Sequence, residues 1–219
     1  MKRFAILGAG SYGREVIPIL REQVRVSGLA GEVVFVDDNL SGTTVNGFSV
    51  VSTEDFINSP HKDKYFNVAI ADDKIRKKAA EVMLCNGVEP ITIRHPNTVV
   101  YDTAQIHNSA ILSPFVTVSA NTTIGEFFHA NIYSYVAHDC IIGNYVTFAP
   151  GAKCNGNVII EDHVYVGSGA VIKQGTPRCP VVIETGAVIG MGAIVTKSVK
   201  SGITVCGNPA RELIKLGMK

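Results

Sequence analysis

The chain has 219 residues, of which 46% are apolar, and its 20 basic residues nearly balance its 19 acidic ones. This length allows one or two domains with complete cores, and a net charge of +1 gives no electrostatic reason to expect a nucleic-acid or membrane-surface partner. The N-terminal stretch becomes polar too soon for a signal peptide, and no apolar run reaches transmembrane length, so we expect a cytoplasmic protein.

A Gly-rich turn follows the first apolar run. Residues 4–7 predict a strand, residues 8–13 read Gly-Ala-Gly-Ser-Tyr-Gly, and a helical pattern continues over residues 16–20. This order brings backbone N–H groups and a helix N-terminus against a phosphate group. The pattern predicts a nucleotide-binding turn.

A second strand is predicted over residues 33–36, and it ends in Asp37 and Asp38, where an acid would reach a ribose hydroxyl. Such a pattern usually means a dinucleotide cofactor. Only about 90 residues precede the repeat described below, which is too few for a six-stranded dinucleotide domain. A half-sized α/β unit that holds a nucleotide group fits better.

The same unit continues with a helix candidate over residues 53–58 and a strand over residues 66–70. Ala71 and Asp72 follow that strand, at the edge where open parallel sheets bind ligands, and a basic helix comes next. A last strand is expected over residues 91–93. Arg-His-Pro-Asn then links this unit to the rest of the chain.

The rest of the chain follows a strict six-residue period. Apolar or small residues recur at Val100, Ile106, Leu112, Val118, Ile124, Ala130, Val136, Ile142, Phe148, Cys154, Ile160, Val166 and Ile172, and the series restarts five residues late at Ile183, Ile189 and Val195. A period of six indicates a parallel β-helix in which three faces make one 18-residue coil. Ile106, Ile124, Ile142 and Ile160 should therefore form one of three inner columns.

The interruption of the period predicts a loop over residues 173–182 that projects from the coil. A short helix over residues 210–216 is expected to cap the open end of the coil. The predicted fold is mixed α/β plus all-β. A small Rossmann-like α/β domain over residues 1–95 precedes a parallel β-helix over residues 96–219 with a short C-terminal helix.

His138 is the best candidate for catalysis in the repeat, because it lies two positions past a buried position and therefore on a turn. An accessible His titrates near neutrality, at about pH 6.5, which suits a general base, and the adjacent Asp139 can fix its tautomer. An exposed His without a role is the alternative. Spacing alone does not rank His138 above His107, His129 and His163.

The five cysteines are expected to be reduced and structural. Their number is odd, and Cys140 and Cys154 fall on inward positions of the repeat. This position disfavours a covalent route through Cys140. No His has a second His or a Cys at metal-ligand spacing, so no metal is expected.

Several motifs together point to one family. They are GAGSYGRE, VDD, NVAIADDKIRKK, HPN, AHDCIIG, GAKCNGNV and GNPAR. With these motifs the chain resembles the left-handed β-helix, hexapeptide-repeat acyltransferases, and more narrowly the nucleotide-amino-sugar N-acetyltransferases of the PglD and NeuD type. Through YFNVAIADDKIR, GVEPITI, HANIYSYVAHDC and YVTFAPGAKCNG it looks most like the GDP-perosamine N-acetyltransferases of O-antigen (lipopolysaccharide) synthesis.

The resemblance implies a homotrimer with acetyl-CoA in the groove between adjacent subunits, and the nucleotide of the acceptor on the N-terminal domain. It implies transfer of the acetyl group to the C4 amine of a nucleotide-linked 4-amino-4,6-dideoxy sugar, with GDP-perosamine as the best match. In the family motif the His is the base and the following acid orients it. These residues are His138 and Asp139 here, with Asp in place of the commoner Glu.

The resemblance also implies binding residues. A second family His that contacts acetyl-CoA is replaced here by Thr147, which keeps a hydrogen-bonding hydroxyl but loses an imidazole. The other implied acetyl-CoA contacts are Gly156, Ser168 and Met191. The implied acceptor contacts are Gly10, Ser11, Tyr12, Gly13, Asp37, Asp38, Ala71 and Asp72, with Asn131 and Tyr133 beside the sugar ring.

Other functions stay open at this point. The acceptor can be a UDP- or dTDP-linked 4-amino sugar, or a hydroxyl of a sialic acid, and competition between acceptors separates these. A sugar-nucleotide-binding scaffold without activity would not bind CoA. A nicotinamide-dependent oxidoreductase rests on the Gly-rich turn alone and lacks the required domain length.

Overall fold

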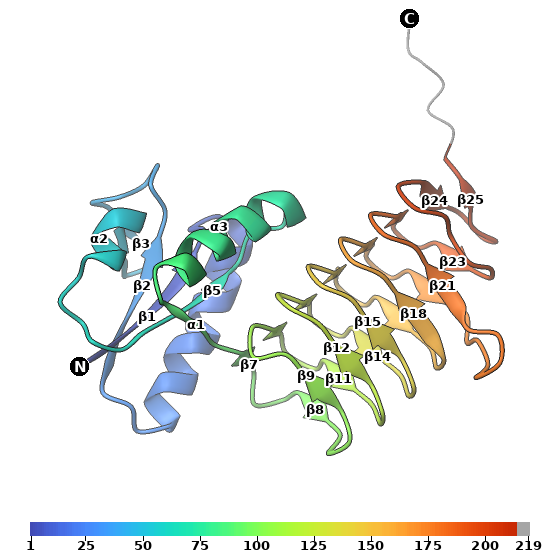
Figure 1. Cartoon of the computed structure of the whole chain (residues 1–219), viewed down its shortest axis with the longest axis horizontal. Coiled ribbons are helices and arrows are strands. Elements are labelled where there is room, and N and C mark those ends of the chain that lie inside the picture. The colour runs from blue at the N-terminus through green and yellow to red at the C-terminus, as the bar shows by residue number, and fades with distance from the viewer. Residues whose placement is uncertain (214–219) are drawn as a thin grey trace, which may run out of the picture. The chain divides into compact units, whose positions relative to one another are not determined.

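The computed structural model describes residues 1–213, and it contains two compact units (Figure 1). One unit comprises Met1–Pro96 with Asn108–Ser113, and the other comprises Asn97–His107 with the chain from Pro114 onward. Among the helices of residues 1–213, none combines the length and apolar character needed to cross a bilayer.

The first unit is built on a six-stranded sheet in the order β3-β4-β2-β1-β5-β6. Its strands are β1 (Lys2–Leu7), β2 (Gly31–Val36), β3 (Thr44–Val45), β4 (Phe48–Val51), β5 (Lys64–Val68) and β6 (Glu89–Pro90). All neighbours pair in parallel except β3 and β4. Since β2 and β5 lie on opposite sides of β1, the Gly-rich turn after β1 opens at the switch point of the sheet, where such folds bind ligands.

Three helices accompany this sheet: α1 (Ser11–Val26), α2 (Thr53–Ile57) and α3 (Asp73–Cys85). Helix α1 buries Val16, Ile17 and Leu20 in a core shared with Phe4 and Phe35, as the helical pattern predicts. One expected strand has different bounds. Instead of residues 91–93, the chain forms β6 and then β7 (Ile93–Arg94), which pairs with β10 (Ile111–Leu112) of the same unit.

Gly13 is the tightest point of the Gly-rich turn, because a Cβ there would lie 1.9 Å from the Gly8 carbonyl oxygen. We expect Gly13→Ala to lower the free energy of unfolding by about 1–3 kcal/mol, the usual cost of overpacking. Gly10→Ala is the matched control, since its Cβ would meet nothing within 4 Å. Urea denaturation of both variants checks this, and equal stabilities would contradict it.

The second unit is a parallel β-helix of short strands. Their bounds are β8 (Val99–Val100), β9 (Gln105–Ile106), β11 (Thr117–Val118), β12 (Thr123–Ile124), β13 (His129–Ala130), β14 (Tyr135–Val136), β15 (Ile141–Ile142), β16 (Thr147–Phe148), β17 (Lys153–Cys154), β18 (Val158–Ile160), β19 (Tyr165–Val166), β20 (Val171–Ile172), β21 (Val181–Ile183), β22 (Val188–Ile189), β23 (Ile194–Val195), β24 (Thr204–Cys206) and β25 (Arg211–Glu212). Within this unit they form three sheets, β8-β11-β14-β17-β20-β23, β9-β12-β15-β18-β21 and β13-β16-β19-β22-β24-β25.

The six-residue period predicted the stacking of these coils. Ile124 pairs with Ile106 on one side and with Ile142 on the other, and Ile142 pairs with Ile160. The inward positions from Leu112 to Ile172 are all buried. Burial of these inward side chains therefore fixes the register of the coil.

The loop expected at the interruption lies between β20 and β21, and Thr176 pairs with Cys179 across it. Beyond it the register resumes, because Ile160 pairs with Ile183. The prediction of a helix over residues 210–216 is wrong for the residues that the structure describes. Residues 211–212 form β25, antiparallel to β24, because the last coil offers unpaired backbone groups that this strand satisfies. Residues 214–216 of that prediction lie outside the described residues.

The corners of the coil have a backbone feature that the sequence pattern did not reveal. The residue three places after the inward positions from Leu112 to Val166, and after Ile183 and Ile189, is left-handed, with φ from 49° to 68°. These residues are Phe115, Asn121, Phe127, Tyr133, Asp139, Tyr145, Gly151, Asn157, His163, Gly169, Gly186 and Gly192. Gly, Asn and Asp are the residues that most readily adopt this backbone at turns. The aromatic corners stack instead on the same corner of the next coil, Phe115 on Tyr133 at 4.9 Å and Tyr145 on His163 at 5.3 Å between ring centroids. These stacking contacts offset the cost of the left-handed backbone.

Candidate active site

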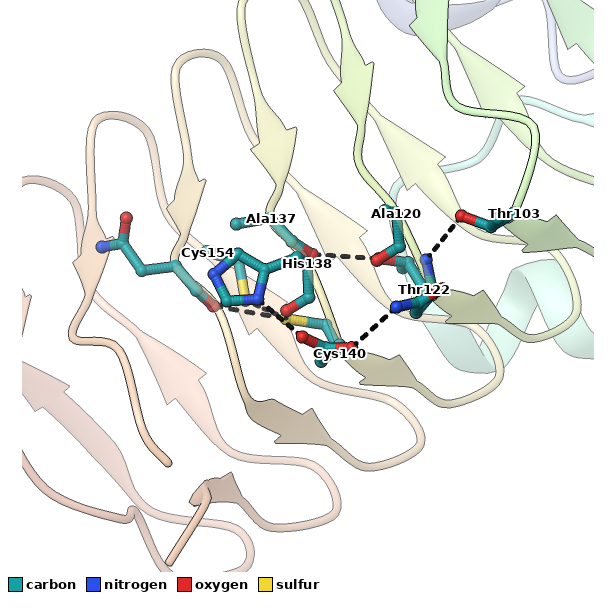
Figure 2. Close-up of polar contacts among 10 residues, drawn as sticks. Thr103, Ala120, Thr122, Ala137, His138, Cys140 and Cys154 are labelled. Atoms are coloured by element: carbon teal, nitrogen blue, oxygen red, sulfur yellow. Dashed lines mark hydrogen bonds and ion pairs between the residues drawn. The ribbon is translucent and has the colours of Figure 1, made fainter. Parts of the chain in front are cut away.

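His138 lies on the corner between β14 and β15, as predicted, and it is paired with Asp139 (Figure 2). The His138 Nδ1 atom is 2.7 Å from the Asp139 Oδ2 atom. The two side chains are 46% and 47% exposed, so a substrate can reach the imidazole. The pair combines an accessible ring with a fixed carboxylate neighbour, as a general base requires.

The charge of Asp139 sets the tautomer of His138. Hydrogen bonds from His138 and Asn121 hold the pKa of the Asp139 carboxyl below its usual range, so Asp139 is ionised at neutral pH. A carboxylate only accepts hydrogen bonds, and therefore the His138 Nδ1 atom carries the proton in their contact. In the neutral ring, Nε2 is left with the lone pair that can take a proton from a substrate.

Gly156 lies directly against the imidazole of His138. A Cβ at position 156 would be 2.4 Å from Cε1 and 2.5 Å from Nε2 of that ring. Gly156 is itself buried. The ring can therefore hold its position only while residue 156 has no side chain, a constraint that the motif did not reveal.

The thiol of Cys140 faces inward, as its place in the repeat predicts. Its Sγ atom donates to the Asn155 carbonyl oxygen at 3.2 Å and lies 4.0 Å from the Sγ atom of Cys154. Both cysteines are fully buried. The geometry therefore favours His138 over Cys140 as the group that meets a substrate.

The other histidines of the repeat have different surroundings. His129 is 1% exposed on β13, and His163 stacks on Tyr145 at a corner. His107 is half-buried. Accessibility and the contact with Asp139 thus distinguish His138, which sequence spacing alone did not.

The remaining residues expected at the acetyl-CoA and sugar sites lie on several faces of the coil. Thr147 is buried on β16, in a different sheet from β14, which leads to His138. Asn131 donates through its side chain to the Phe148 carbonyl oxygen at 3.1 Å. Tyr133 and Met191 are 61% and 81% exposed. Ser168 is half-buried, and its carbonyl oxygen accepts from the N–H of Gly192.

In the first unit, Asp37 and Asp38 line one cavity of about 260 Å³ at the carboxyl ends of β1 and β2. Asp37 accepts from the N–H of Ala9 at 3.0 Å, and Asp38 accepts from the N–H of Thr53 at 2.7 Å. Both carboxylates thus shape the rim of the cavity. Gly8 also lines the cavity and belongs to the predicted Gly-rich turn. The sequence did not indicate the other lining residues, which are Leu7, Val36, Asn39, Thr53, Ile70, Ile75 and Ala79.

The other residues predicted to contact the acceptor are not among those lining this cavity. Gly10, Ser11 and Ala71 are exposed, and Asp72 caps helix α3 by accepting from the N–H groups of Lys74 and Ile75. Gly13 is buried in α1. Tyr12 is turned into the core, where burial raises the pKa of its phenol above the usual range.

Two family descriptions match the chain, the PglD N-terminal domain over residues 3–83 and the bacterial transferase hexapeptide (six repeats) over residues 121–156. GDP-perosamine N-acetyltransferase of Escherichia coli O157:H7 is 66% identical over 97% of each chain. The chain belongs to this N-acetyltransferase family. Among solved structures, WeeI from Acinetobacter baumannii AYE is 52% identical with a TM-score of 0.94, over 97% of this chain and 100% of WeeI.

A second solved structure of this group is a complex with a ligand. The acetyltransferase domain of PglB from Neisseria gonorrhoeae FA1090, in complex with acetyl coenzyme A, is 29% identical with a TM-score of 0.86, over 96% of this chain and 98% of that one. These likenesses confirm the predicted fold of the N-acetyltransferase, a Rossmann-like α/β region followed by a left-handed parallel β-helix.

Proposed function

We propose that the chain transfers the acetyl group of acetyl-CoA to the C4 amine of GDP-perosamine. The exposed His138–Asp139 pair carries the proposal, in a chain 66% identical to a GDP-perosamine N-acetyltransferase. A structural relative in complex with acetyl coenzyme A supports the choice of donor. The cytoplasmic location and the absence of a metal stay predictions.

The reaction needs a proton acceptor beside the amine. At neutral pH the C4 amine is mostly an ammonium, which has no lone pair with which to attack the thioester. His138 takes a proton through Nε2, Asp139 stabilises the imidazolium, and the amine nitrogen bonds to the acetyl carbon. The C–S bond then breaks, and the proton on His138 passes to the departing thiolate, which leaves as CoA. The second proton of the amine nitrogen is lost to water as the neutral amide forms.

The binding residues belong to the same proposal. Gly10–Gly13, Asp37, Asp38, Ala71 and Asp72 are assigned to the nucleotide of the acceptor, and the cavity beside Asp37 supports this for the two acids. Asn131 and Tyr133 are assigned to the sugar, and Thr147, Gly156, Ser168 and Met191 to acetyl-CoA.

A homotrimer, with acetyl-CoA between adjacent β-helices, belongs to the proposal as well. It would cover the strongly exposed side chains of Tyr133 and Met191. Sedimentation of the full chain measures this, and a monomer at assay concentrations would contradict it.

The test is release of free CoA thiol with a panel of acceptors. The panel contains GDP-perosamine, UDP- and dTDP-linked 4-amino-4,6-dideoxy sugars and a sialic acid. We expect fast turnover with GDP-perosamine and weak turnover with the others. A preference for an acceptor with another nucleotide would show that this acceptor, and not GDP-perosamine, is the substrate. Thiol release with the sialic acid alone would show that the reaction is O-acetylation and not N-acetylation.

A further inference from the structure

The corner that carries Asp139 joins successive coils through a ladder of polar contacts, which Figure 2 draws between Thr103 and His138. The backbone N–H of Asn121 donates to the Thr103 Oγ1 atom at 3.0 Å. The Asn121 side chain donates through Nδ2 to the Asp139 Oδ1 atom at 3.1 Å. The ladder therefore runs from Thr103 through Asn121 and Asp139 to the imidazole of His138.

Each oxygen of the Asp139 carboxylate has its own donor. Oδ1 accepts from Asn121, and Oδ2 is 2.7 Å from the His138 Nδ1 atom. An ionised carboxylate accepts only, so the amide NH2 group of Asn121, and not its oxygen, faces Asp139. With one oxygen held by Asn121, rotation of the half-exposed carboxylate is restricted, and the other oxygen stays aimed at His138.

We propose that Asn121 is a positioning residue for the base, acting through Asp139. Its amide holds the carboxylate in the rotamer that keeps the proton on Nδ1 of His138, so that Nε2 faces the substrate with its lone pair. This inference rests on the proposed function, in which His138 is the base.

A backbone role is the alternative explanation for Asn121. Its φ is 56°, a left-handed value that Asn tolerates better than most residues, and Asn157 has the same φ two coils further along that corner. Glycine adopts this backbone without strain. Asn121→Gly therefore removes the amide and keeps the corner, whereas Asn157→Gly measures the stability cost of the same change at a matched position.

The experiment compares kcat and its pH profile for the wild type, Asn121→Gly and Asn121→Asp. Asn121→Gly should lower kcat roughly 10-fold with little change in KM for acetyl-CoA, because the base is mispositioned while binding is unaffected. Asn121→Asp places a like charge beside Asp139, which favours the protonated ring. The acid limb of its kcat profile should therefore move to higher pH by about one unit.

A double-mutant cycle with Asp139→Asn separates positioning from structure. If Asn121 acts through Asp139, Asn121→Gly should change kcat less than about twofold once Asp139 is Asn. An undiminished loss in that background would overturn the proposal, as would wild-type kcat and pH profile in Asn121→Gly. If Asn121→Gly unfolds, the near-isosteric Asn121→Asp gives the answer through its pH profile, and an unmoved acid limb overturns the proposal. A wild-type chain that releases no thiol with any acceptor would refute the proposed function instead.

Discussion

Replacing His138 with Ala is expected to lower kcat for acetyl transfer by roughly 100-fold or more, the usual contribution of a general base. The variant leaves only water to take the proton from the C4 ammonium. Because the His138 side chain is half exposed, its removal opens no buried cavity, and the melting temperature should stay close to that of the wild type. Steady-state thiol release and thermal unfolding measure the two quantities.

The deficit of the His138 variant should shrink toward alkaline pH, where more of the amine is already deprotonated in solution. His61→Ala, in the stretch between α2 and β5, is the control for loss of an imidazole elsewhere and should keep wild-type kcat. A near-wild-type rate for His138→Ala at neutral pH would remove His138 from the mechanism.

Gly156→Ala is expected to cost roughly 100-fold in kcat while leaving the fold intact. The added methyl group would lie 2.4 Å from the His138 ring, so the ring must move away from its place above residue 156. The obstructed atoms belong to a half-exposed side chain and not to backbone, and the ring can rotate toward solvent. The melting temperature should therefore change by only about 3 °C or less.

The His138→Ala background is the control for this prediction. If Gly156→Ala acts by displacing the ring, it should change the residual rate of that background less than about twofold. A raised KM for acetyl-CoA with unchanged kcat would show instead that residue 156 acts through donor binding, the role that the family resemblance implies. Kinetics of the four chains in the cycle distinguish these outcomes.

Much of the fold was predictable because burial acts on every coil in the same way. The series from Leu112 to Ile172 repeats one inward position, and one period fixes both strand register and coil size. The first unit was predictable for a similar reason, since residues 4–7 and 33–36 are short apolar runs followed by turn residues.

The site was less predictable, because its contacts depend on which corners meet. Asn121 and Asp139 are 18 residues apart, the same spacing that predicted the inward columns, but the turn positions have no hydrophobic pattern that draws attention to them. The steric contact of Gly156 with His138 was not predictable from the sequence, since it depends on the rotamer of the His138 side chain. The strand Arg211–Glu212 was missed because the pairing with β24, and not local propensity, decides its conformation.

The measurement that tests the central claim most directly is analysis of the product formed from acetyl-CoA and GDP-perosamine by the wild-type chain. Nuclear magnetic resonance of that product should show an amide at C4 of the sugar, formed with release of one CoA thiol per acetyl group. An acetyl ester on a sugar hydroxyl, or unchanged GDP-perosamine after prolonged incubation, would contradict the proposed N-acetyltransferase.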